Sequence, residues 1–301
     1  LLYYKFTPIK DPAAVVLWQK SLTGSLDLKG RILVSSHGLN GTVGGDIDAL
    51  KAYVKATKQY PGFKDIVFKW SDGSADDFPR ISVKHRRELV GFQNSDEEFD
   101  VDEQGVIGSG THLKPRQVHE LVEQFGDDVV FFDGRNAHEA SVGKFKGAIV
   151  PNTNTSRDFI AELESDKYDD IKDKKVVTYC TGGVRCEVIS AMMKKRGFKD
   201  VYQIDGGIVK YGEAYGDDGL WEGALRVFDK RMTTNFSDDA VTIGVCTHCE
   251  GKTSNFENCA FANCNDLVLI CENCKEDTNL LYHTEACRVA AIAPVKAPAV
   301  E

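Results

Sequence analysis

VVTYCTGGVRCEVIS, residues 176–190, joins a short apolar run to a helix-forming segment through a cysteine, two glycines and an arginine. A short apolar run of this kind is typical of a parallel strand that is covered on both faces. In an open parallel sheet the functional groups lie beyond the carboxyl ends of the strands, and Cys180 comes at that end. The stretch therefore predicts a strand, a sharp turn and a helix, with Cys180 at the functional edge of a doubly wound α/β sheet.

The turn after Cys180 has the features of an anion-binding loop. Gly182 and Gly183 permit backbone dihedrals that other residues avoid, and successive N–H groups in such a turn can point inward. The N-terminus of the following helix and the Arg185 side chain add positive charge. These groups favour a thiolate, so we expect the pKa of Cys180 to lie below its usual value of about 8.5. The predicted catalytic residues are Cys180 and Arg185, and the predicted anion cradle consists of Thr181, Gly182, Gly183 and Val184.

The two cysteines of this stretch each leave an alternative open. Cys180 could be a buried cysteine at a strand end with no chemistry of its own, which is common. Cys186 follows the loop directly. It either forms a disulfide that resolves a persulfide or sulfenate on Cys180, or it is a small residue in the first helical turn that points away.

Length and composition limit the class of protein. A chain of 301 residues suits two or three domains, and 42% hydrophobic with 28% charged residues allows packed cores. Apolar runs are shorter than the roughly 18 residues of a membrane span, and LLYYKFTPIK lacks the order of a signal peptide. We expect a cytoplasmic protein without a membrane partner. The net charge of −9 argues only weakly against nucleic acid, because a local basic face can still bind RNA.

Residues 1–92 predict a ferredoxin-like, or acylphosphatase-like, domain. Strands are expected in LLYYKFTPI, in RILVSS, after the glycine-rich HGLNGTVGG, in DIVFKWSD and in ISVKHRREL. Helices are expected in PAAVVLWQKSL and after Asp46, a candidate N-cap. The order β-α-β-β-α-β is typical of this fold. The acidic, glycine-containing residues 93–112 are expected to form a solvated linker.

Residues 113–225 predict a doubly wound parallel-sheet domain. Apolar runs typical of covered parallel strands are VVFFD, GAIV, KVVTYC and VYQI. Helices fit between them in PRQVHELVEQF, SRDFIAELES and RCEVISAMMKKRG, the last of which ends at Gly197. This alternation of strands and helices is the pattern of an α/β layer.

Residues 226–288 contain seven of the nine cysteines. An odd total and this clustering argue against a secreted disulfide scaffold, and the CTHC and CENC segments have the spacing of a tetrahedral zinc site. Seven cysteines and one histidine could complete two such sites; the alternative is free thiols. The Ala/Pro-rich residues 289–301 are expected to be a mobile tail. The candidate zinc ligands are Cys246, Cys249, Cys259, Cys264, Cys271, Cys274, Cys287 and His283.

The loop CTGGVR resembles the active-site loop of a rhodanese domain, with four residues between the cysteine and the arginine. Cysteine phosphatases place five residues there, so the shorter loop suits one extra sulfur rather than a phosphoryl group. DGRNAHEASVGKFKGAIVPN resembles the rhodanese segment in which Asp133 and Arg135 follow a strand. The resemblance implies a structural role for Asp133 and leaves open whether Arg135 faces the site.

With GGIVKYGE, WEGALRVFDKR, the NGTVGG and RRELV segments and the cysteine-rich end, essentially the whole chain resembles the bacterial tRNA uridine hydroxylases that have a central rhodanese domain. The resemblance implies an oxidoreductase that uses molecular oxygen to convert the tRNA wobble uridine to 5-hydroxyuridine. It also implies that Cys180 is the catalytic cysteine and that the partner is the tRNA anticodon loop. The sequence shows no signal for flavin, haem, a nucleotide or a 2-His-1-carboxylate iron site, so a thiolate or persulfide on Cys180 is the candidate oxygen carrier.

A tRNA partner requires basic groups that contact phosphate. Phosphate contacts position a nucleic acid, and a wobble base already lies in a single-stranded loop. The alternative for the candidate cluster is a solvated charged face. The candidate RNA-binding residues are Lys84, His85, Arg86 and Arg87.

Two other functions stay open at this point. One is sulfurtransfer, in which sulfane sulfur passes through a persulfide on Cys180, and rapid cyanide-dependent turnover would favour it. The other is a non-catalytic RNA-binding or scaffold protein on a decayed rhodanese fold, and full activity of Cys180→Ala would favour that.

Overall fold

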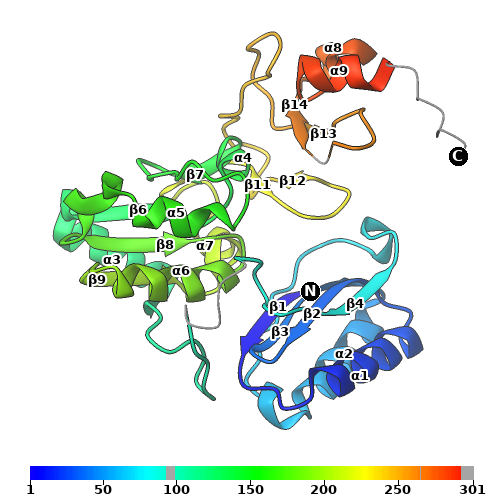
Figure 1. Ribbon diagram of the computed structural model, residues 1–301, viewed down its shortest axis with the longest axis vertical. Helices are drawn as coiled ribbons and strands as arrows, with labels where there is room; N and C mark the ends of the chain where they lie inside the picture. Colours follow the sequence, from blue (N-terminus) through cyan, green and yellow to red (C-terminus); the bar gives the residue numbers. More distant parts are fainter. Residues whose placement is uncertain (93–98, 265, 293–301) are drawn as a thin grey trace, which may run out of the picture.

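The structure is a computed structural model that describes residues 1–92, 99–264 and 266–292. An N-terminal α/β domain, a central α/β domain and a cysteine-rich element follow one another along the chain and are stacked from bottom to top in Figure 1. The predicted fold class, a ferredoxin-like domain followed by a doubly wound parallel-sheet domain and a cysteine-rich end, is confirmed.

The N-terminal domain has the predicted order β-α-β-β-α-β. Its sheet has the strand order β1-β3-β2-β4, with β2 and β4 parallel and the other neighbours antiparallel. Asp46 caps the second helix as predicted, since its carboxylate accepts the Asp48 N–H at 2.9 Å. The elements are β1 (Leu2–Phe6), α1 (Pro12–Ser25), β2 (Lys29–Ser35), β3 (Gly38–Gly44), α2 (Ile47–Lys58), the 3₁₀ turns Pro61–Phe63 and Ala75–Asp77, and β4 (Ile81–His85).

The segment DIVFKWSD was expected to be a strand and is not one. It makes a single bridge to the sheet, in which the Lys69 and Leu2 backbones exchange two hydrogen bonds of 2.9 Å. Ile66 nevertheless lies in the N-terminal core, and Phe68 packs against that core. The apolar pattern therefore reports burial here rather than strand pairing.

Strand β1 is buried on both faces, and this decides how the first two domains meet. Tyr3 belongs to the core beneath helices α1 and α2, whereas Phe6 belongs to a core shared with the central domain, against which Tyr4 packs. Successive side chains of a strand point to opposite faces, so β1 serves two cores at once. Leu2 is on the same face as Tyr4 and Phe6.

The central domain has a four-stranded parallel sheet in the order β5-β9-β8-β6. One face packs with α5 and α6 through residues such as Phe132 and Val176, and the other packs with α3 and α7 through Val177 and Tyr179 (Figure 1). The alternation between two buried faces explains the apolar runs in the sequence. The elements are β5 (Thr111–Leu113), α3 (Pro115–Phe125), the 3₁₀ turn Gly126–Asp128, β6 (Val129–Asp133), α4 (Ala137–Ala140), β7 (Gly143–Phe145), α5 (Asp158–Glu164), the 3₁₀ helix Asp166–Ile171, β8 (Lys175–Tyr179), α6 (Val184–Lys195), β9 (Asp200–Ile204) and α7 (Gly207–Tyr215).

Two parts of this domain differ from the expectation. The GAIV run forms only an isolated bridge from Ile149 to Phe132, so β6 is the edge strand on that side of the sheet and β5 is the edge strand on the other. Residues 99–112 of the expected linker are partly packed, because Phe99 and Val106 are buried in the core shared by the two domains. Residues 93–98 of that linker lie outside the described residues.

The C-terminal element is poor in regular structure. Helix α9 continues through residues 289–292 of the expected tail, and residues 293–301 lie outside the described residues. Within the described part of the chain, none of the helices combines the length and apolar character that crossing a membrane requires. Strand β10 (Trp221–Gly223) pairs with β7 of the central domain. The elements that follow it are β11 (Leu225–Arg226), β12 (Thr233–Thr234), β13 (Phe256–Asn258), β14 (Leu267–Leu269), α8 (Glu272–Lys275), the 3₁₀ turn Thr278–Leu280 and α9 (Glu285–Ile292).

Candidate active site

The loop after β8 wraps around the Cys180 sulfur. Strand β8 ends at Tyr179, and α6 begins at Val184 with Gly183 as its N-cap at φ +100°. That left-handed conformation favours glycine, and it turns the Gly183 N–H towards the Cys180 Sγ at 3.2 Å. The backbone N–H groups of Arg185 and Cys186 also lie near this sulfur and favour its charged form. One tight turn around Cys180 is therefore formed by Thr181, Gly182, Gly183 and Val184. Three of the groups facing its sulfur are backbone amides.

These contacts lower the pKa of Cys180 below its ordinary value. Burial alone would raise it, since Cys180 is 1% exposed and a charged sulfur is disfavoured away from water. The Cys186 S–H, the Arg185 charge and the backbone N–H groups of residues 185 and 186 all favour the thiolate and outweigh burial. The loop is therefore built to hold an anionic sulfur.

Helix α7 fixes the loop from the opposite side. The Ile208 and Val209 N–H groups donate to the carbonyl oxygens of Cys180 and Thr181, at 2.9 and 3.1 Å. Gly207 lies so close that a Cβ there would be 2.4 Å from the Cys180 oxygen. The start of α7 consequently has no room for a side chain against the loop.

Arg185 is held by a buried carboxylate. Its guanidinium donates to Glu139 Oε1 and Oε2 at 2.6 and 2.9 Å and to Thr181 Oγ1 at 3.4 Å. Glu139 is fully buried, and although burial alone would raise its pKa, Arg185, Arg135 and His138 lower it to about 2. Arg185 thus acts on Cys180 as a fixed charge whose hydrogen bonds go mainly to Glu139.

Asp133 and Arg135 form a second buried pair. Arg135 donates to Asp133 at 2.6 and 2.9 Å and to the Gly143 carbonyl oxygen at 2.7 Å, and both side chains are fully buried. The Arg135 guanidinium also lies over the rings of Tyr179 and Trp221. Arg135 therefore lies in the domain core, where it joins β6 to β7.

Cys186 lies beside Cys180 rather than pointing away from it. Its S–H interacts with the Cys180 sulfur, and burial together with the neighbouring thiolate raises the pKa of Cys186. Cys186 is fully buried, and its sulfur would be 3.3 Å from a Cβ at Gly134. In this state Cys186 is a neutral donor to the thiolate.

The N-terminal domain covers the loop. A Cβ at Gly182 would be 2.7 Å from a Leu2 methyl carbon, and a Cβ at Gly183 would be 2.9 Å from the Tyr4 hydroxyl oxygen. Tyr4 also donates to Glu187 in the first turn of α6 at 2.9 Å. Leu2 and Tyr4 therefore cover this side of the loop.

Comparison with known proteins places this site in a family. The chain matches the UPF0176 acylphosphatase like domain over residues 1–89, the rhodanese-like domain over residues 115–214 and the rhodanase C-terminal domain over residues 222–288. It is 63% identical to the tRNA uridine(34) hydroxylase of Corynebacterium jeikeium (strain K411) over 277 residues, which cover 92% of this chain and 89% of that protein. The chain belongs to the tRNA uridine(34) hydroxylase family.

The chain is also similar to other proteins. The tRNA uridine(34) hydroxylase of Rhodococcus opacus (strain B4) is 60% identical over 277 residues, which cover 92% of this chain and 97% of that protein. The solved rhodanese-like domain of the Alr3790 protein from Anabaena sp. is 18% identical with a TM-score of 0.30 and covers 37% of this chain and 78% of that chain. The residues of this chain that match the rhodanese-like domain, 115–214, include the whole Cys180 loop.

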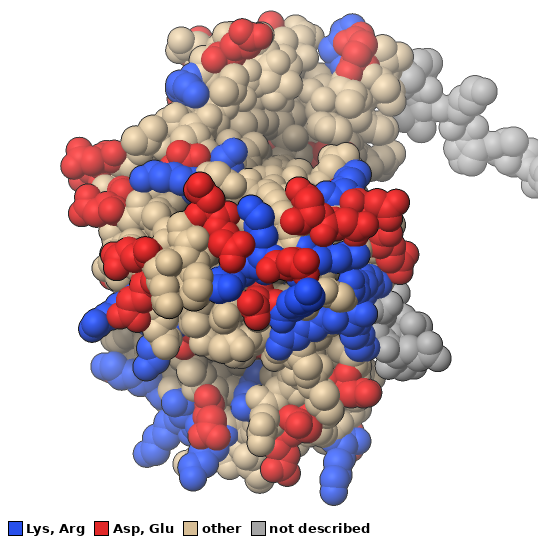
Figure 2. All heavy atoms as spheres, turned by 90° about the vertical axis from the view of Figure 1, so that its left-hand side faces the viewer, with Lys and Arg blue, Asp and Glu red and all other residues tan. Residues whose placement is uncertain are grey.

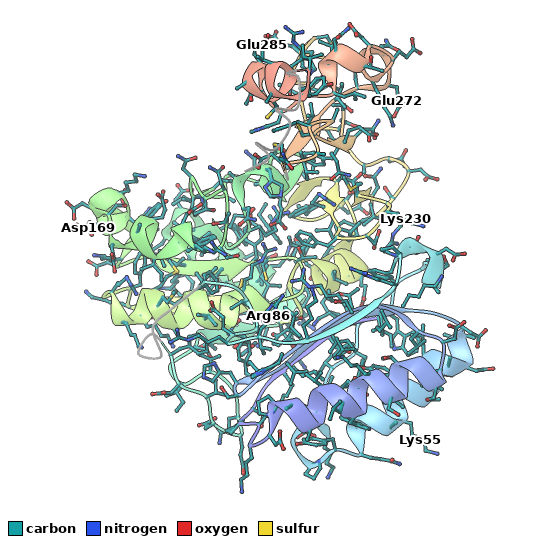
Figure 3. The ribbon with its side chains drawn as sticks, turned by 45° about the vertical axis from the view of Figure 1, so that its right-hand side comes forward. Lys55, Arg86, Asp169, Lys230, Glu272 and Glu285 are labelled. Atoms are coloured by element: carbon teal, nitrogen blue, oxygen red, sulfur yellow. The ribbon has the colours of Figure 1, made fainter. Side chains whose placement is uncertain are left out.

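The basic residues predicted to bind RNA lie on the surface of the protein. Lys84, His85, Arg86 and Arg87 are all exposed, at and after the carboxyl end of β4. Figure 3 shows Arg86 at the junction between the N-terminal sheet and the central domain. Figure 2 shows that Lys and Arg side chains on one face of the molecule gather beside Asp and Glu side chains, so the charge there is mixed.

The seven C-terminal cysteines separate into two groups. Cys246, Cys249, Cys271 and Cys274 have ligand atoms within 4.8 Å of one another, as do Cys259, Cys264 and Cys287. His283 groups with Cys264 and Asp266 instead of with the whole second set. All nine cysteines lie in the described residues, and none of them forms a disulfide.

The sequence pattern missed three residues at the site. Glu139 follows Arg135 by four residues. The one signal for Glu139 in the sequence is that a buried arginine needs a negatively charged partner. Tyr4 could have been found from the alternation of β1, which leaves a second apolar face to be covered. Lys69 lies in a segment that looked like a strand, and the sequence carried no signal of its position beside the loop.

Proposed function

We propose that this protein hydroxylates uridine 34 of tRNA to 5-hydroxyuridine, with Cys180 as the essential thiolate. The observation that carries the proposal is the Cys180 loop, which holds a buried anionic sulfur in a chain that is 63% identical to a tRNA uridine(34) hydroxylase. Arg185 and the loop amides stabilise the thiolate, and the Cys186 S–H adds a further donor.

We further propose that molecular oxygen is the oxidant, that the activated sulfur carries one of its atoms to the base, and that the other atom leaves as water with two electrons and two protons from a thiol reductant. A nest of N–H groups can also accommodate a persulfide, because its outer sulfur is an anion. The anticodon loop is the proposed partner, with phosphates contacted by Lys84, His85, Arg86 and Arg87. A tRNA substrate and nine unpaired cysteines are consistent with the cytoplasm.

Nucleoside mass spectrometry tests the proposed activity. Cells that lack the protein are rescued with the wild type or with Cys180→Ser, and tRNA nucleosides are measured. We expect 5-hydroxyuridine and its derivatives only with the wild type. Unchanged tRNA in all strains would remove the hydroxylase proposal, and full rescue by Cys180→Ser would remove the thiolate from it.

Sulfurtransfer is a second candidate, because the loop of four residues between Cys180 and Arg185 surrounds one sulfur with N–H donors. A cyanide-dependent assay with thiosulfate distinguishes the two functions. Rapid turnover by a protein that leaves tRNA uridine unchanged would make sulfurtransfer the better account.

Zinc is the proposed structural metal of the C-terminal element. Zinc–sulfur bonds of about 2.3 Å in a tetrahedron place the sulfurs about 3.8 Å apart, and the Cys249 and Cys271 sulfurs are 3.5 Å apart. Cys246, Cys249, Cys271 and Cys274 therefore fit a closed four-thiolate site. Cys259, Cys264 and Cys287 supply three ligands of a second site, for which His283 is the proposed fourth. These residues would hold the element together and leave no position for a reactant.

A further inference from the structure

A cavity of about 550 Å³ lies between the N-terminal and central domains. Tyr4 and Lys69 line it from the N-terminal side, and His112, Glu187 and Gly206 line it from the central domain. Its volume falls within the roughly 300–1,000 Å³ of small-molecule sites.

The cavity wall touches the catalytic loop in two places. Tyr4, in the wall, has its hydroxyl oxygen against Gly183, and Gly206 is followed by Gly207, which lies against the Cys180 carbonyl oxygen. Tyr4 is therefore shared by the cavity wall and the surroundings of the Cys180 loop.

Lys69 is an unusual residue in this wall. It is 3% exposed, its Nζ is 4.9 Å from the centre of the Tyr4 ring, and its Cε would be 3.2 Å from a Cβ at Gly206. Within the described part of the chain no carboxylate forms an ion pair with it. A buried ammonium without a carboxylate partner is costly, so it calls for a role.

The ammonium stays largely charged at neutral pH. Burial lowers the pKa of Lys69 to about 8 and Lys210 acts in the same direction, whereas Cys180, Asp205 and Glu187 raise it. Lys69 is thus a hydrogen-bond donor in the wall of the cavity.

Glu187 supplies an acceptor in the same wall. Its Oε1 accepts from Tyr4 and His112, both at 2.9 Å, and its Oε2 accepts from Gln203 at 3.0 Å. A carboxylate has about four lone-pair sites, so three partners leave one acceptor position.

We propose that this cavity binds the uracil ring of the target nucleotide, with Lys69 donating to the C4 carbonyl oxygen and Glu187 accepting from the N3–H. The inference rests on the proposed function and deepens it, because it makes the N-terminal domain part of the active site. Uracil presents a carbonyl acceptor beside the N3–H donor, whereas cytosine presents the reverse pattern. The same pair of residues therefore selects uracil and rejects cytosine.

The mouth of the cavity suits the sugar–phosphate backbone. Lys5 and Lys114 line it, and Lys114 is exposed. Neither lysine forms an ion pair within the described residues, so both remain available to phosphate oxygens.

The test compares binding of two anticodon stem–loop RNAs, with uridine or cytidine at position 34, by fluorescence anisotropy. We expect the wild type to bind the uridine RNA more tightly than the cytidine RNA. Lys69→Met should bind the uridine RNA about 10- to 100-fold more weakly than the wild type does, as expected for loss of a hydrogen bond to a charged group. The variant should also bind the two RNAs with equal affinity. Lys58→Met is the matched control, because Lys58 also places its ammonium over an aromatic ring, that of Phe68, but lies outside the cavity. Equal binding of both RNAs by wild type, or full preference retained by Lys69→Met, would overturn the proposal.

A second measurement requires no variant and so does not depend on the folding of Lys69→Met. The uridine at position 34 is replaced by 4-thiouridine, and the RNA is cross-linked to the wild-type protein. We expect cross-links to peptides containing Tyr4, Lys69 or residues 205–210, and cross-links confined to the cysteine-rich element would contradict the proposal. Both assays measure binding without turnover, so their failure is distinguishable from failure of the hydroxylase proposal.

Discussion

Replacement of Glu139 by glutamine should destabilise the central domain substantially. Glu139 is fully buried and pairs through both oxygens with Arg185, whose side chain is 11% exposed. The pKa of Glu139 is lowered from 4.5 to about 2; burial opposes this shift, and the Arg185 charge and hydrogen bonds cause it. At about 1.4 kcal/mol for each pKa unit, the ionised carboxylate contributes about 3 kcal/mol to the free energy of unfolding. The same magnitude is typical when one partner of a buried ion pair is removed.

The pH dependence has a defined sign. A carboxyl group with a lowered pKa in the folded state stabilises fully above its unfolded pKa, and this stability is lost as the pH falls through the folded value. The difference between wild type and Glu139→Gln should therefore be largest at neutral pH and should narrow by about 1 kcal/mol at pH 4.

Urea unfolding followed by circular dichroism measures this difference, and hydrogen exchange of peptides from β8 and α6 assigns it to the central domain. Glu120→Gln is the matched control, because Glu120 pairs with Arg116 on the surface, with side chains 54% and 85% exposed, and such pairs contribute about 1 kcal/mol or less. If Glu139→Gln costs no more than Glu120→Gln, or if its cost does not change with pH, the assigned role of the Glu139–Arg185 pair is wrong.

Three further predictions concern the loop and the cysteine-rich element. Cys186→Ala should raise the pKa of Cys180 by about one unit through loss of the S–H donor, whereas Cys186→Ser keeps a donor and should leave the pKa of Cys180 nearly as low as in the wild type. The rate at which iodoacetamide alkylates the Cys180 peptide, measured across pH, reports this pKa. Identical pH profiles for wild type and Cys186→Ala would contradict the prediction. Gly207→Ala should abolish activity because its Cβ would lie 2.4 Å from the Cys180 carbonyl oxygen and 2.7 Å from the Gly183 backbone nitrogen. Gly197→Ala, at φ +92° with no atom nearby, carries only the backbone cost of about 1–2 kcal/mol and should remain active. Equal activity of the two variants would refute the steric argument. Cys249→Ser should lower the zinc content of the protein, measured by inductively coupled plasma mass spectrometry. It should also destabilise the C-terminal element without changing the stability of the central domain. An unchanged zinc content would show that Cys249 is not a zinc ligand.

Local patterns in the sequence predicted the elements that carry the site. The apolar run before Cys180 and the glycines after it predicted strand β8, the turn and helix α6, because these features depend on neighbouring residues. The Asp46 cap and the order of the N-terminal domain followed in the same way.

Contacts between distant segments could not be predicted from those patterns. Lys69 reaches the loop because one bridge fixes it to Leu2, more than 60 positions away in sequence, and the segment around it is apolar without being a strand. Glu139, in α4 after strand β6, pairs with Arg185, which lies 46 positions later at the start of α6 after strand β8. Phe99 and Val106 looked like parts of an acidic linker because their burial depends on a core shared by two domains. In each case the determining partner lies outside any local window of sequence.

The most direct test of the account is oxygenation by the purified protein. Wild type and Cys180→Ser are incubated under oxygen-18 gas with a thiol reductant and tRNA that lacks the modification, and the nucleoside at position 34 is analysed by mass spectrometry. The account predicts 5-hydroxyuridine at position 34 that carries the heavy oxygen, formed by wild type and absent with Cys180→Ser. Labelled product from Cys180→Ser would contradict the assignment of the buried thiolate as the essential group.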